Sequence, residues 1–424
     1  MNLLKKIAGS YLILLTLFTL LIIGVHTIPQ SAIRENIITS THTLEKEGLY
    51  KKFFNFKLFQ MDNFTDAYML NLAASADSRQ PVEAGMMNYA YKSKNFMDLA
   101  FDTEKAAKGE MGGLEKSSYG RYWQGYQTTL RPILTVLNYP QIRVLNYVLF
   151  TLLIVWIIRM LARKTSTATA CLFGISLLLI NFPIVPYSMQ FSTCFYIAFI
   201  SMILLMKVPI LTKSDTNTLC TFFVIGGVTS YLDFLTTPQL TLGLPLIIYM
   251  LMKQPKNAWK TVIALCVVWG LGYGLLWASK WMMGYILTGN NILTDAMQSA
   301  ELRTSNQYNG MEMTIPNIIR FIWTNIEAKG LIPLFYAGIV GILLCLGLYL
   351  KMLKSKQVFK KYSWLLLVMM IVPVWFLIMR NHSIQHGWFT WRAGLLSLFS
   401  LLLFVYYTTD RKKLFKTDIN KSHE

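Results

Sequence analysis

Residues 7–25 read IAGSYLILLTLFTLLIIGV, an uncharged apolar run that decides how the rest of the chain is interpreted. The hydrocarbon core of a bilayer is roughly 30 Å thick, and crossing it takes about 20 residues of α-helix. The run is too long for the apolar region of a cleaved signal peptide, and no small-residue cleavage site follows it. We therefore expect an uncleaved membrane anchor.

Nine further apolar runs follow the first one. The 424-residue chain is 54% hydrophobic and only 14% charged, whereas a soluble domain is typically about 25% charged. The predicted spans cover residues 7–25, 144–161, 168–186, 191–206, 217–236, 239–252, 260–278, 331–350, 363–379 and 393–409. The predicted fold class is an all-α integral membrane protein with about 10 transmembrane helices and a large helical external loop between the first two.

The distribution of lysine and arginine predicts the orientation. One set of termini and connections carries twenty basic and four acidic residues, whereas residues 29–141 hold thirteen basic and twelve acidic ones. Because cytoplasmic loops are enriched in Lys and Arg, both termini are expected in the cytoplasm and 29–141 outside. The predicted organisation is a cytoplasmic N-terminus with the first span (1–28), an external loop (29–141), a bundle with external loops at 279–330 and 380–392 (142–409), and a cytoplasmic basic tail (410–424).

Several function classes are disfavoured by composition and motifs. The net charge of +19 is spread over short loops between spans, so it follows from the membrane topology and does not indicate a nucleic-acid partner. The five cysteines lie within or at the ends of predicted spans, which suggests neither a disulfide framework nor a metal-type spacing. No Walker motif is present, which argues against an ATP-driven pump.

Residues 44–60 (LEKEGLYKKFFNFKLFQ) combine an apolar stripe of Leu49, Phe53 and Phe56 with several lysines. Aromatic and basic residues on an amphipathic helix are typical of a segment lying in the membrane interface. The alternative is a helix that docks on the spans.

Asp62 and Asp66 follow at once, in MDNFTDAYMLNLA (61–73). Their spacing places them on one helical face, where like charges cost about 0.2–0.5 kcal/mol. Asp62 alone is explained as an N-cap that accepts the backbone N–H of Thr65. Two carboxylates held together beside a membrane suit general-base chemistry, or binding of a hydroxyl or a cation, and both are predicted as catalytic candidates.

The stretch 119–146 leads into the second span and contains Arg121, Trp123, Tyr126 and Arg131. Its aromatic residues are also explained by an interfacial belt. The arginines lie on the predicted outer side, against the usual charge bias, and guanidinium groups bind phosphate in a bidentate manner. We predict that these four residues contact the substrate or a lipid phosphate.

The short predicted external loop RNHSIQHGWFTWR (380–392) concentrates His382, His386 and Arg392. A zinc site is weakly indicated, because no third ligand follows nearby. Arginine and protonated histidine for an anion, with indole rings for a sugar face, predict a phosphate-and-sugar pocket instead.

Asp233 and Lys280 each sit at the outer end of a predicted span. Ionisable residues at such positions are functional candidates. The alternatives are a boundary residue in the headgroup layer for Asp233, an ion pair between the two residues, or a contact of Lys280 with phosphate.

Taken together, the chain resembles the GT-C superfamily of membrane glycosyltransferases, in a bacterial, Firmicutes-like subgroup. The resemblance rests on an acidic motif in the first external loop and on four blocks: DNFTDAYMLN (62–71), YWQGYQTTLRP (122–132), YLDFLTTPQLTLGLPLIIY (231–249) and NHSIQHGWFTWR (381–392). The family often has adjacent acidic residues, whereas Asn63 stands next to Asp62 here. Which of Asp62 and Asp66 acts as the base is therefore open.

The resemblance implies an inverting enzyme of the bacterial cytoplasmic membrane with an external active site. A sugar on a polyprenyl-phosphate donor would pass to a cell-envelope glycan or lipid-linked acceptor, with an aspartate as base and Arg or His residues binding the phosphate. No metal ligand is assigned, a divalent cation as cofactor is left open, and membrane lipids are the other expected partners. The alternatives are a lipid-linked glycan ligase or polymerase, a transporter or flippase for envelope precursors, and a non-enzymatic assembly factor.

Overall fold

The computed structural model describes residues 3–55, 59–233, 235–308, 310–312, 314–317, 320 and 332–410. The chain forms two compact units. Unit 1 contains Met1–Ser299 and Phe389–Leu395, and unit 2 contains Ala300–Trp388 and Leu396–Glu424. Most of the described residues are helical, as expected for an all-α protein, and the strands form two short two-stranded sheets.

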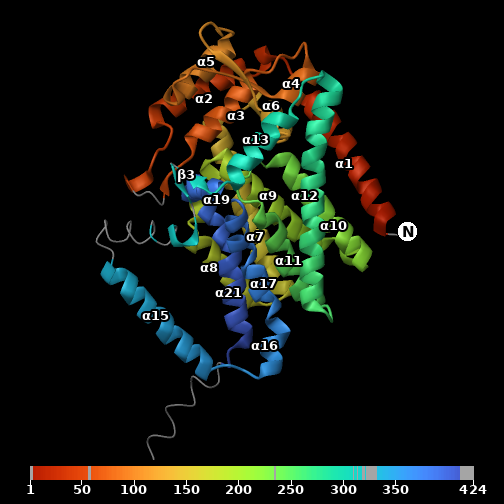
Figure 1. The fold of residues 1–424 in the computed structure, drawn as a ribbon, viewed down its shortest axis with the longest axis vertical. Helices are drawn as coiled ribbons and strands as arrows, with labels where there is room; N and C mark the ends of the chain where they lie inside the picture. Colours follow the sequence, from red (N-terminus) through yellow and green to blue (C-terminus); the bar gives the residue numbers. More distant parts are fainter. Residues whose placement is uncertain are drawn as a thin grey trace, which may run out of the picture. The chain divides into compact units, whose positions relative to one another are not determined.

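Unit 1 begins with an apolar helix, continues through a group of shorter elements and ends in long apolar helices (Figure 1). The first elements are α1 (Leu3–Val25), η1 (Gln30–Ala32), α2 (Arg34–Glu47), η2 (Phe53–Asn55), α3 (Asn63–Ala74), α4 (Pro81–Met87), β1 (Tyr89–Lys92), η4 (Phe96–Asp98), α5 (Leu99–Lys108), β2 (Glu115–Ser118) and α6 (Gln127–Leu134). The later ones are α7 (Tyr139–Lys164), α8 (Thr167–Leu179), η5 (Phe182–Tyr187), α9 (Met189–Lys207), η6 (Pro209–Thr212), α10 (Asp215–Leu232), α11 (Gln239–Lys253), α12 (Ala258–Thr288), most of α13 (Leu293–Thr304) and, near the C-terminus, η7 (Trp391–Ala393).

Six helical segments in the described residues are long and apolar enough to cross a membrane. They are Leu3–Val25, Tyr139–Lys164, Met189–Lys207, Ala258–Thr288, Lys356–Ile378 and Gly387–Thr408. Together with the exposed Leu, Ile and Val side chains along α1 and α7, these segments make the chain a helical membrane protein. Every one of the ten predicted runs contains helix, but the count of ten spans stays a prediction. The predicted run 168–186 contains Pro183 and Pro186, which cannot continue an α-helix, so α8 ends at Leu179 and a 3₁₀ segment follows.

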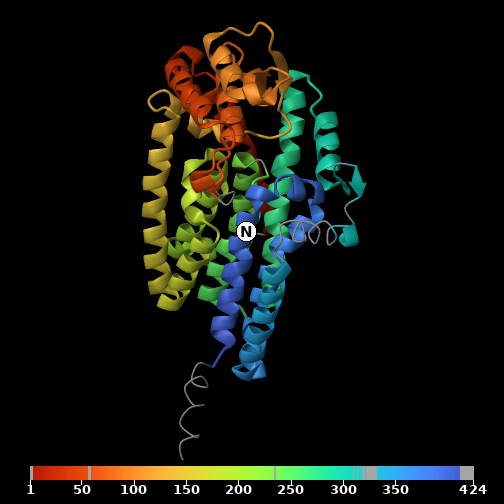
Figure 2. The same cartoon turned by 90° about the vertical axis from the view of Figure 1, so that its left-hand side faces the viewer.

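Two glycines set the tightest crossing of long helices in unit 1. A Cβ atom on Gly226 of α10 would lie 2.1 Å from the Trp269 carbonyl oxygen, and one on Gly272 of α12 would lie 2.1 Å from the Phe223 carbonyl oxygen. Small residues let helix backbones approach closely, which is how membrane helices gain packing without a hydrophobic driving force. The α10–α12 pair is accordingly a major contact of the unit, while α7 packs beside α8 and α9 (Figure 2).

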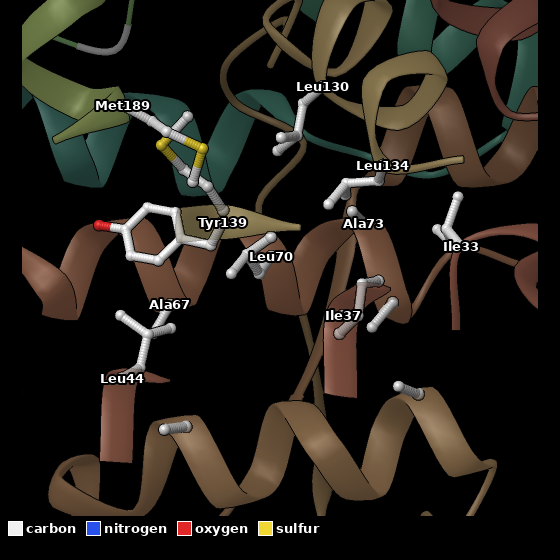
Figure 3. Close-up of a cluster of buried hydrophobic side chains, with 14 of the residues drawn as sticks. Ile33, Ile37, Leu44, Ala67, Leu70, Ala73, Leu130, Leu134, Tyr139 and Met189 are labelled. Atoms are coloured by element: carbon white, nitrogen blue, oxygen red, sulfur yellow. The ribbon is translucent and has the colours of Figure 1, made fainter. Parts of the chain in front are cut away.

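The elements from η1 to α6, in residues 30–55 and 59–134, form a helical head at one end of unit 1 (Figure 1). Its core is made of apolar side chains from α2, α3 and α6, which meet Tyr139 of α7 and Met189 of α9 (Figure 3). Small residues such as Ala67 and Ala73 on α3 let these helices pack closely. β1 and β2 pair antiparallel within the head, with Tyr89 opposite Ser118 and Lys92 opposite Glu115.

Residues 44–60 do not form the continuous amphipathic helix predicted from the sequence. α2 ends at Glu47, because Gly48 takes a φ of 74°, and Phe54 and Asn55 also have positive φ. Lys52 instead pairs with Gln60 in an antiparallel bridge. The prediction of one helix over this stretch is wrong because the backbone turns within it, while its location in the membrane interface stays a prediction; Phe56 lies outside the described residues.

Unit 2 is built from a hairpin and apolar helices. Its elements are β3 (Gln307–Tyr308), β4 (Met311–Glu312), α15 (Ile332–Lys351), α16 (Lys356–Tyr362), α17 (Trp364–Met369), α18 (Ile371–Ile378), α19 (Arg380–Gln385), the start of α20 (Gly387–Thr390) and most of α21 (Gly394–Thr408). Within it, Tyr362 stacks on Tyr407 at 4.5 Å between ring centroids, and Ser397 donates to the Met369 carbonyl oxygen at 2.7 Å. The predicted loop 279–330 begins inside α12 and ends outside the described residues. The predicted basic tail also lies outside the described residues, except for its first residue, Asp410.

Candidate functional site

Asp62 occupies the N-cap of α3, which was the alternative to a catalytic role in the sequence analysis. Its Oδ1 accepts the Thr65 backbone N–H at 3.0 Å, and its Oδ2 accepts the Thr65 hydroxyl at 2.7 Å. No other hydrogen bond to these oxygens is present in the part of the chain that the structure describes. Burial raises the pKa of Asp62 to about 7, against the opposing effects of the Thr65 hydrogen bonds and the positive charge of Arg392. The side chain is a buried carboxyl with unused acceptor capacity.

Asp66 lies one turn further along α3 and is differently placed. Oδ1 accepts from the Ser188 hydroxyl and the Gln190 backbone N–H, both at 3.0 Å. Oδ2 accepts from the Met189 backbone N–H at 3.0 Å and from the Tyr139 hydroxyl. Burial raises the pKa of Asp66, and these hydrogen bonds together with the nearby Arg143 charge oppose the rise.

The partners of Asp66 show what this carboxylate does. Met189 and Gln190 are the first residues of α9, whose free backbone N–H groups need acceptors. A carboxylate also interacts favourably with the positive end of a helix dipole. Asp66 therefore caps α9 from the helical head and ties the head to a membrane-crossing helix.

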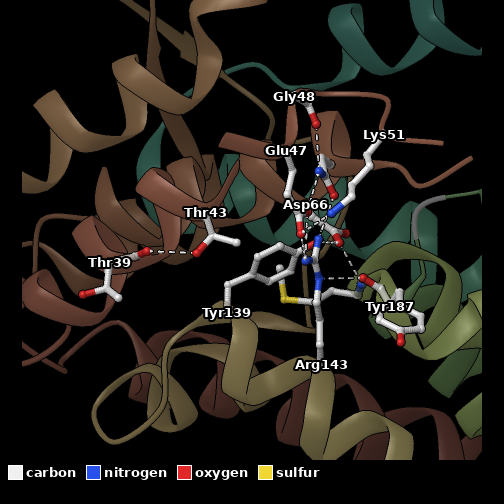
Figure 4. Close-up of polar contacts among 11 residues, drawn as sticks. Thr39, Thr43, Glu47, Gly48, Lys51, Asp66, Tyr139, Arg143 and Tyr187 are labelled. Atoms are coloured by element: carbon white, nitrogen blue, oxygen red, sulfur yellow. Dashed lines mark hydrogen bonds and ion pairs between the residues drawn. The ribbon is translucent and has the colours of Figure 1, made fainter. Parts of the chain in front are cut away.

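Arg143 on α7 joins the same group of residues (Figure 4). Its guanidinium pairs with Glu47 at 2.9 Å and donates to Asn63 Oδ1 at 2.8 Å and to the Tyr139 hydroxyl at 2.9 Å. We call Glu47, Asn63, Asp66, Tyr139 and Arg143 the Asp66 network. Burial alone would raise the pKa of Glu47, but Arg143 together with Asn63 and Lys51 holds that pKa below its ordinary value.

Asn63 explains why this chain lacks two adjacent acidic residues. The Asn63 amide donates to Glu47 Oε2 at 3.0 Å and to the Gly48 carbonyl oxygen at 2.8 Å. A carboxylate at position 63 could not donate and would face these two oxygens directly. The position needs one group that both donates to Glu47 and accepts from Arg143, which an amide provides.

Among the basic residues predicted for the site, Arg392 is the one whose charge lowers the pKa of Asp62. It is buried, its guanidinium lies over the Phe191 ring at 4.5 Å from the centroid, and it makes a 3.5 Å hydrogen bond to the Phe389 carbonyl oxygen. Its Nε is buried without a hydrogen-bond partner within the described residues. Its charge acts on Asp62, yet no direct ion pair joins the two side chains in the described structure. A buried carboxyl and an incompletely coordinated cation thus interact electrostatically, both inside unit 1.

The arginines of the 119–146 stretch are engaged by the protein. Arg131 is fully buried and donates to the carbonyl oxygens of Val25 at 3.2 Å, Ile28 at 2.6 Å and Ala73 at 2.5 Å. Arg121 pairs with Asp295 at 3.1 Å and lies over the Tyr119 ring. The guanidinium of Arg131 therefore joins the end of α1 to the end of α3.

Trp123, Tyr126 and Lys280 are also buried in unit 1. Trp123 donates to the Leu276 carbonyl oxygen at 2.7 Å. Lys280 donates to the Met86 carbonyl oxygen at 2.5 Å and lies 5.6 Å from the Trp123 ring centroid. The ammonium group thus binds the end of α4.

Asp233 and Lys280 do not pair with each other, contrary to one alternative taken from the sequence. The Asp233 carboxylate accepts the backbone N–H groups of Leu235 at 2.9 Å and Thr236 at 3.1 Å, and also the Thr236 hydroxyl. Asp233 therefore closes the turn after α10. It is 3% exposed, so its surroundings are protein groups.

His382 and His386 lie in unit 2, with 4.7 Å between their ring centroids. Arg303 donates to His382 Nδ1 at 2.6 Å, so that nitrogen carries no proton. Burial and the charge of Arg303 lower the pKa of His386 to about 4. Both observations run against the protonated histidines predicted from the sequence, since His382 Nδ1 acts as an acceptor and the protonated form of His386 is disfavoured.

Two apolar hollows border α7 beside the Asp66 network. One, of about 470 Å³, runs along Val144, Val148 and Leu152 and has the Glu47–Arg143 ion pair at its end. The other, of about 500 Å³, lies between α6, α7, α9 and α10 and includes Met189 in its wall. Both have the apolar lining that a hydrocarbon chain requires.

Among the described residues, no group of three or more His, Cys, Asp and Glu side chains is placed to hold a metal ion. The donor set for the divalent cation left open by the sequence is therefore not assembled there. Sequence reasoning did not predict that Glu47, Asn63 and Tyr139 belong to the Asp66 network, nor that Ser188 donates to Asp66. Only Asn63 carried a signal, since it stands beside Asp62 where the resembling family often has an acid.

Comparison with known proteins gives no relative: no protein-family model, no curated protein and no solved structure matches this chain.

Proposed function

We propose that the protein is a membrane glycosyltransferase that uses a polyprenyl-phosphate sugar as donor and acts on the outer face of the bacterial cytoplasmic membrane. The acceptor is a hydroxyl of a cell-envelope glycan or of a lipid-linked sugar. Asp62 removes the proton from that hydroxyl as it attacks C1 of the sugar, and the configuration at C1 inverts. The phosphate leaves without a general acid, because it is already a good leaving group.

The observation that carries the proposal is the setting of Asp62. A general base works best when its pKa lies near the operating pH, and burial brings the pKa of Asp62 to about 7. Its oxygens bond only to Thr65 within the described residues, so acceptor capacity remains for a substrate hydroxyl. Asp66 has no such capacity, because four donors already occupy its oxygens.

Arg392 is the residue that we assign to the departing phosphate. Its guanidinium is buried and its Nε has no acceptor within the described residues. Preorganised cations in a water-poor site stabilise developing negative charge strongly. The apolar hollows beside α7 support the proposal, since an isoprenoid tail needs such a surface next to the reacting phosphate.

The proposal requires movement of the side chains that cover Asp62. The carboxyl is 1% exposed, so an acceptor hydroxyl reaches it only after the site opens. Closure around the substrate would then exclude water, which is a common feature of transferases that must avoid hydrolysis. The proposed orientation, with both termini in the cytoplasm, rests on the basic residues at the ends of α7 and α9 that lie far from the head.

The test compares cell-wall and lipid-linked glycans of a deletion strain complemented with the wild type, Asp62→Asn or Asp77→Asn. Asp77→Asn is the matched control, because Asp77 pairs with Arg79 on the surface of the same head. We expect Asp62→Asn to accumulate to the wild-type level and to lose one glycan modification by about 10²–10⁴-fold in rate, the usual effect of a general base.

Asp77→Asn should retain the modification in full. If Asp62→Asn restores the glycan as well as the wild type does, Asp62 is not the base. If deletion of the gene changes no envelope glycan at all, the transferase proposal itself fails.

A further inference from the structure

The end of α7 that is far from the Asp66 network carries a second, unrelated feature. A hollow of about 420 Å³ lies between the last turns of α7 and α9. Four cationic residues line it, namely Arg159, Arg163, Lys164 and Lys207. The remaining lining is Trp156 and two methionines, so no carboxylate faces the four charges.

Within the described residues, the four cations have no anionic partner. None of the ion pairs found in the described residues includes any of them, and their head groups donate no side-chain hydrogen bond there. The Lys207 ammonium instead lies 5.6 Å from the centre of the Trp156 ring. Four like charges around one hollow repel each other, and this repulsion is relieved when an anion binds.

The location of the hollow relative to the membrane can be read along α7. Sixteen residues separate Arg143 from Arg159 and twenty separate it from Arg163, which corresponds to about 24–30 Å of helix. That length matches the roughly 30 Å hydrocarbon core. Between the two ends, Val148, Leu152 and Val155 are exposed and apolar, as expected for a lipid-facing stripe. The hollow therefore lies at the membrane boundary opposite the head, and Trp156 stands at the level typical of interfacial indoles.

We propose that this hollow binds the phosphate of an anionic phospholipid headgroup. The two guanidinium groups can hold phosphate oxygens in a bidentate manner, while the two ammonium groups add charge. Basic pockets between membrane helices on the cytoplasmic side are suited to such headgroups. The acyl chains would lie on the exposed apolar faces of α7 and α9, along Leu152 and Leu204. This site is separate from the proposed transferase site and does not depend on it.

The test measures lipid binding to the purified full-length chain by native mass spectrometry, with phosphatidylglycerol and phosphatidylcholine as probes. The variant is Lys164→Gln/Lys207→Gln, and the matched control is Lys253→Gln/Lys256→Gln, which removes two exposed lysines on the same predicted side. We expect phosphatidylglycerol to bind the wild type more tightly than phosphatidylcholine. We also expect the first variant to weaken that binding on the order of tenfold, since each basic residue near a membrane contributes measurably to anionic-lipid affinity.

The control pair should leave the affinity within about twofold, and Lys164→Arg/Lys207→Arg, which keeps the charges, should retain binding. Equal binding of the two lipids by the wild type would overturn the proposal, as would equal losses in the variant and the control. A further measurement uses inorganic phosphate as the probe. If it binds the lipid-free protein with the same sensitivity to Lys164→Gln/Lys207→Gln and displaces phosphatidylglycerol, the site belongs to a soluble phosphate and the lipid assignment is wrong.

Discussion

Asp62 and Asp66 stand one helical turn apart in the same buried region, yet the protein uses them in opposite ways. Asp66 accepts four hydrogen bonds from α7 and α9, whereas Asp62 accepts two, both from its own neighbour Thr65. Both carboxyls are almost inaccessible to solvent. The difference lies in how many donors each one meets.

The number of donors around a buried carboxyl decides whether it suits a structural role or proton transfer. A buried carboxylate surrounded by donors holds elements together, because leaving those donors unpaired costs about 1–3 kcal/mol each. A buried carboxyl with few donors is costly to ionise, and the same property makes it a better base near neutral pH. We therefore assign Asp66 to the attachment of the helical head and Asp62 to proton transfer.

The largest expected effect concerns the network around Asp66. Replacing Arg143 by Gln removes the more buried of the two cations that pair with Glu47, leaves only the half-exposed Lys51 beside it in the described structure, and removes donors from Asn63 and Tyr139. Breaking a buried pair in this way costs about 3–5 kcal/mol, so we expect a clear fall in the melting temperature of the purified protein in detergent. The control is Arg79→Gln, which breaks an exposed pair with Asp77 worth at most about 1 kcal/mol. Equal melting temperatures for the two variants would show that the network does not stabilise the head.

A smaller effect is expected from Asn63→Asp, which recreates the adjacent acidic pair of the family that the chain resembles. The new carboxylate would face Glu47 and the Gly48 carbonyl oxygen, to which Asn63 now donates. We expect destabilisation by about 1–3 kcal/mol, measured by thermal unfolding, and no gain in transfer rate. Asn291→Asp, at an exposed position, should change stability by less than about 0.5 kcal/mol. A stable and more active Asn63→Asp variant would mean that position 63 belongs to the catalytic group.

The smallest expected effect is the pH dependence of the wild-type transfer rate. Asp62 can accept a proton only when ionised, and burial raises its pKa to about 7. Below that pH the ionised fraction falls about tenfold per unit, so kcat/KM should fall with the same slope between about pH 6 and 5. A profile that stays flat over this range would exclude Asp62 as the base, and the proposed difference in role between Asp62 and Asp66 would then be wrong.

Some of these structural features could be predicted from the sequence alone. Apolar runs such as 7–25 and 144–161 predicted where helices form, because hydrophobic length is a local property. The N-cap alternative for Asp62 could be named for the same reason, since its partner Thr65 is three residues away. The break of the helix at Gly48 was missed, because the apolar spacing of residues 44–60 continues through the turn.

The division of roles between the two aspartates could not be predicted. Ser188 and Gln190, which occupy Asp66, are more than a hundred residues away in the chain. Arg131 matched a phosphate-binding pattern by residue type, but only the folded structure shows that three backbone carbonyl groups hold it. Residue type predicts which groups a side chain can bind. The number of partners that it already has in the fold decides whether it can still bind a substrate.

The most direct test measures the melting temperatures of Asp62→Asn and Asp66→Asn against the wild type from pH 5 to 8. The pKa of Asp62 is about 7 in the folded protein and has an ordinary value of 3.8, so ionisation destabilises the fold. The penalty is absent below about pH 4, grows as the pH rises, and reaches up to about 4 kcal/mol above pH 7. Asparagine keeps the N-cap without this penalty. We predict that Asp62→Asn melts at a higher temperature than the wild type at pH 8, with a gain that shrinks toward pH 5, while Asp66→Asn melts at a lower temperature throughout. A loss of stability in Asp62→Asn as large as that in Asp66→Asn would contradict the assignment.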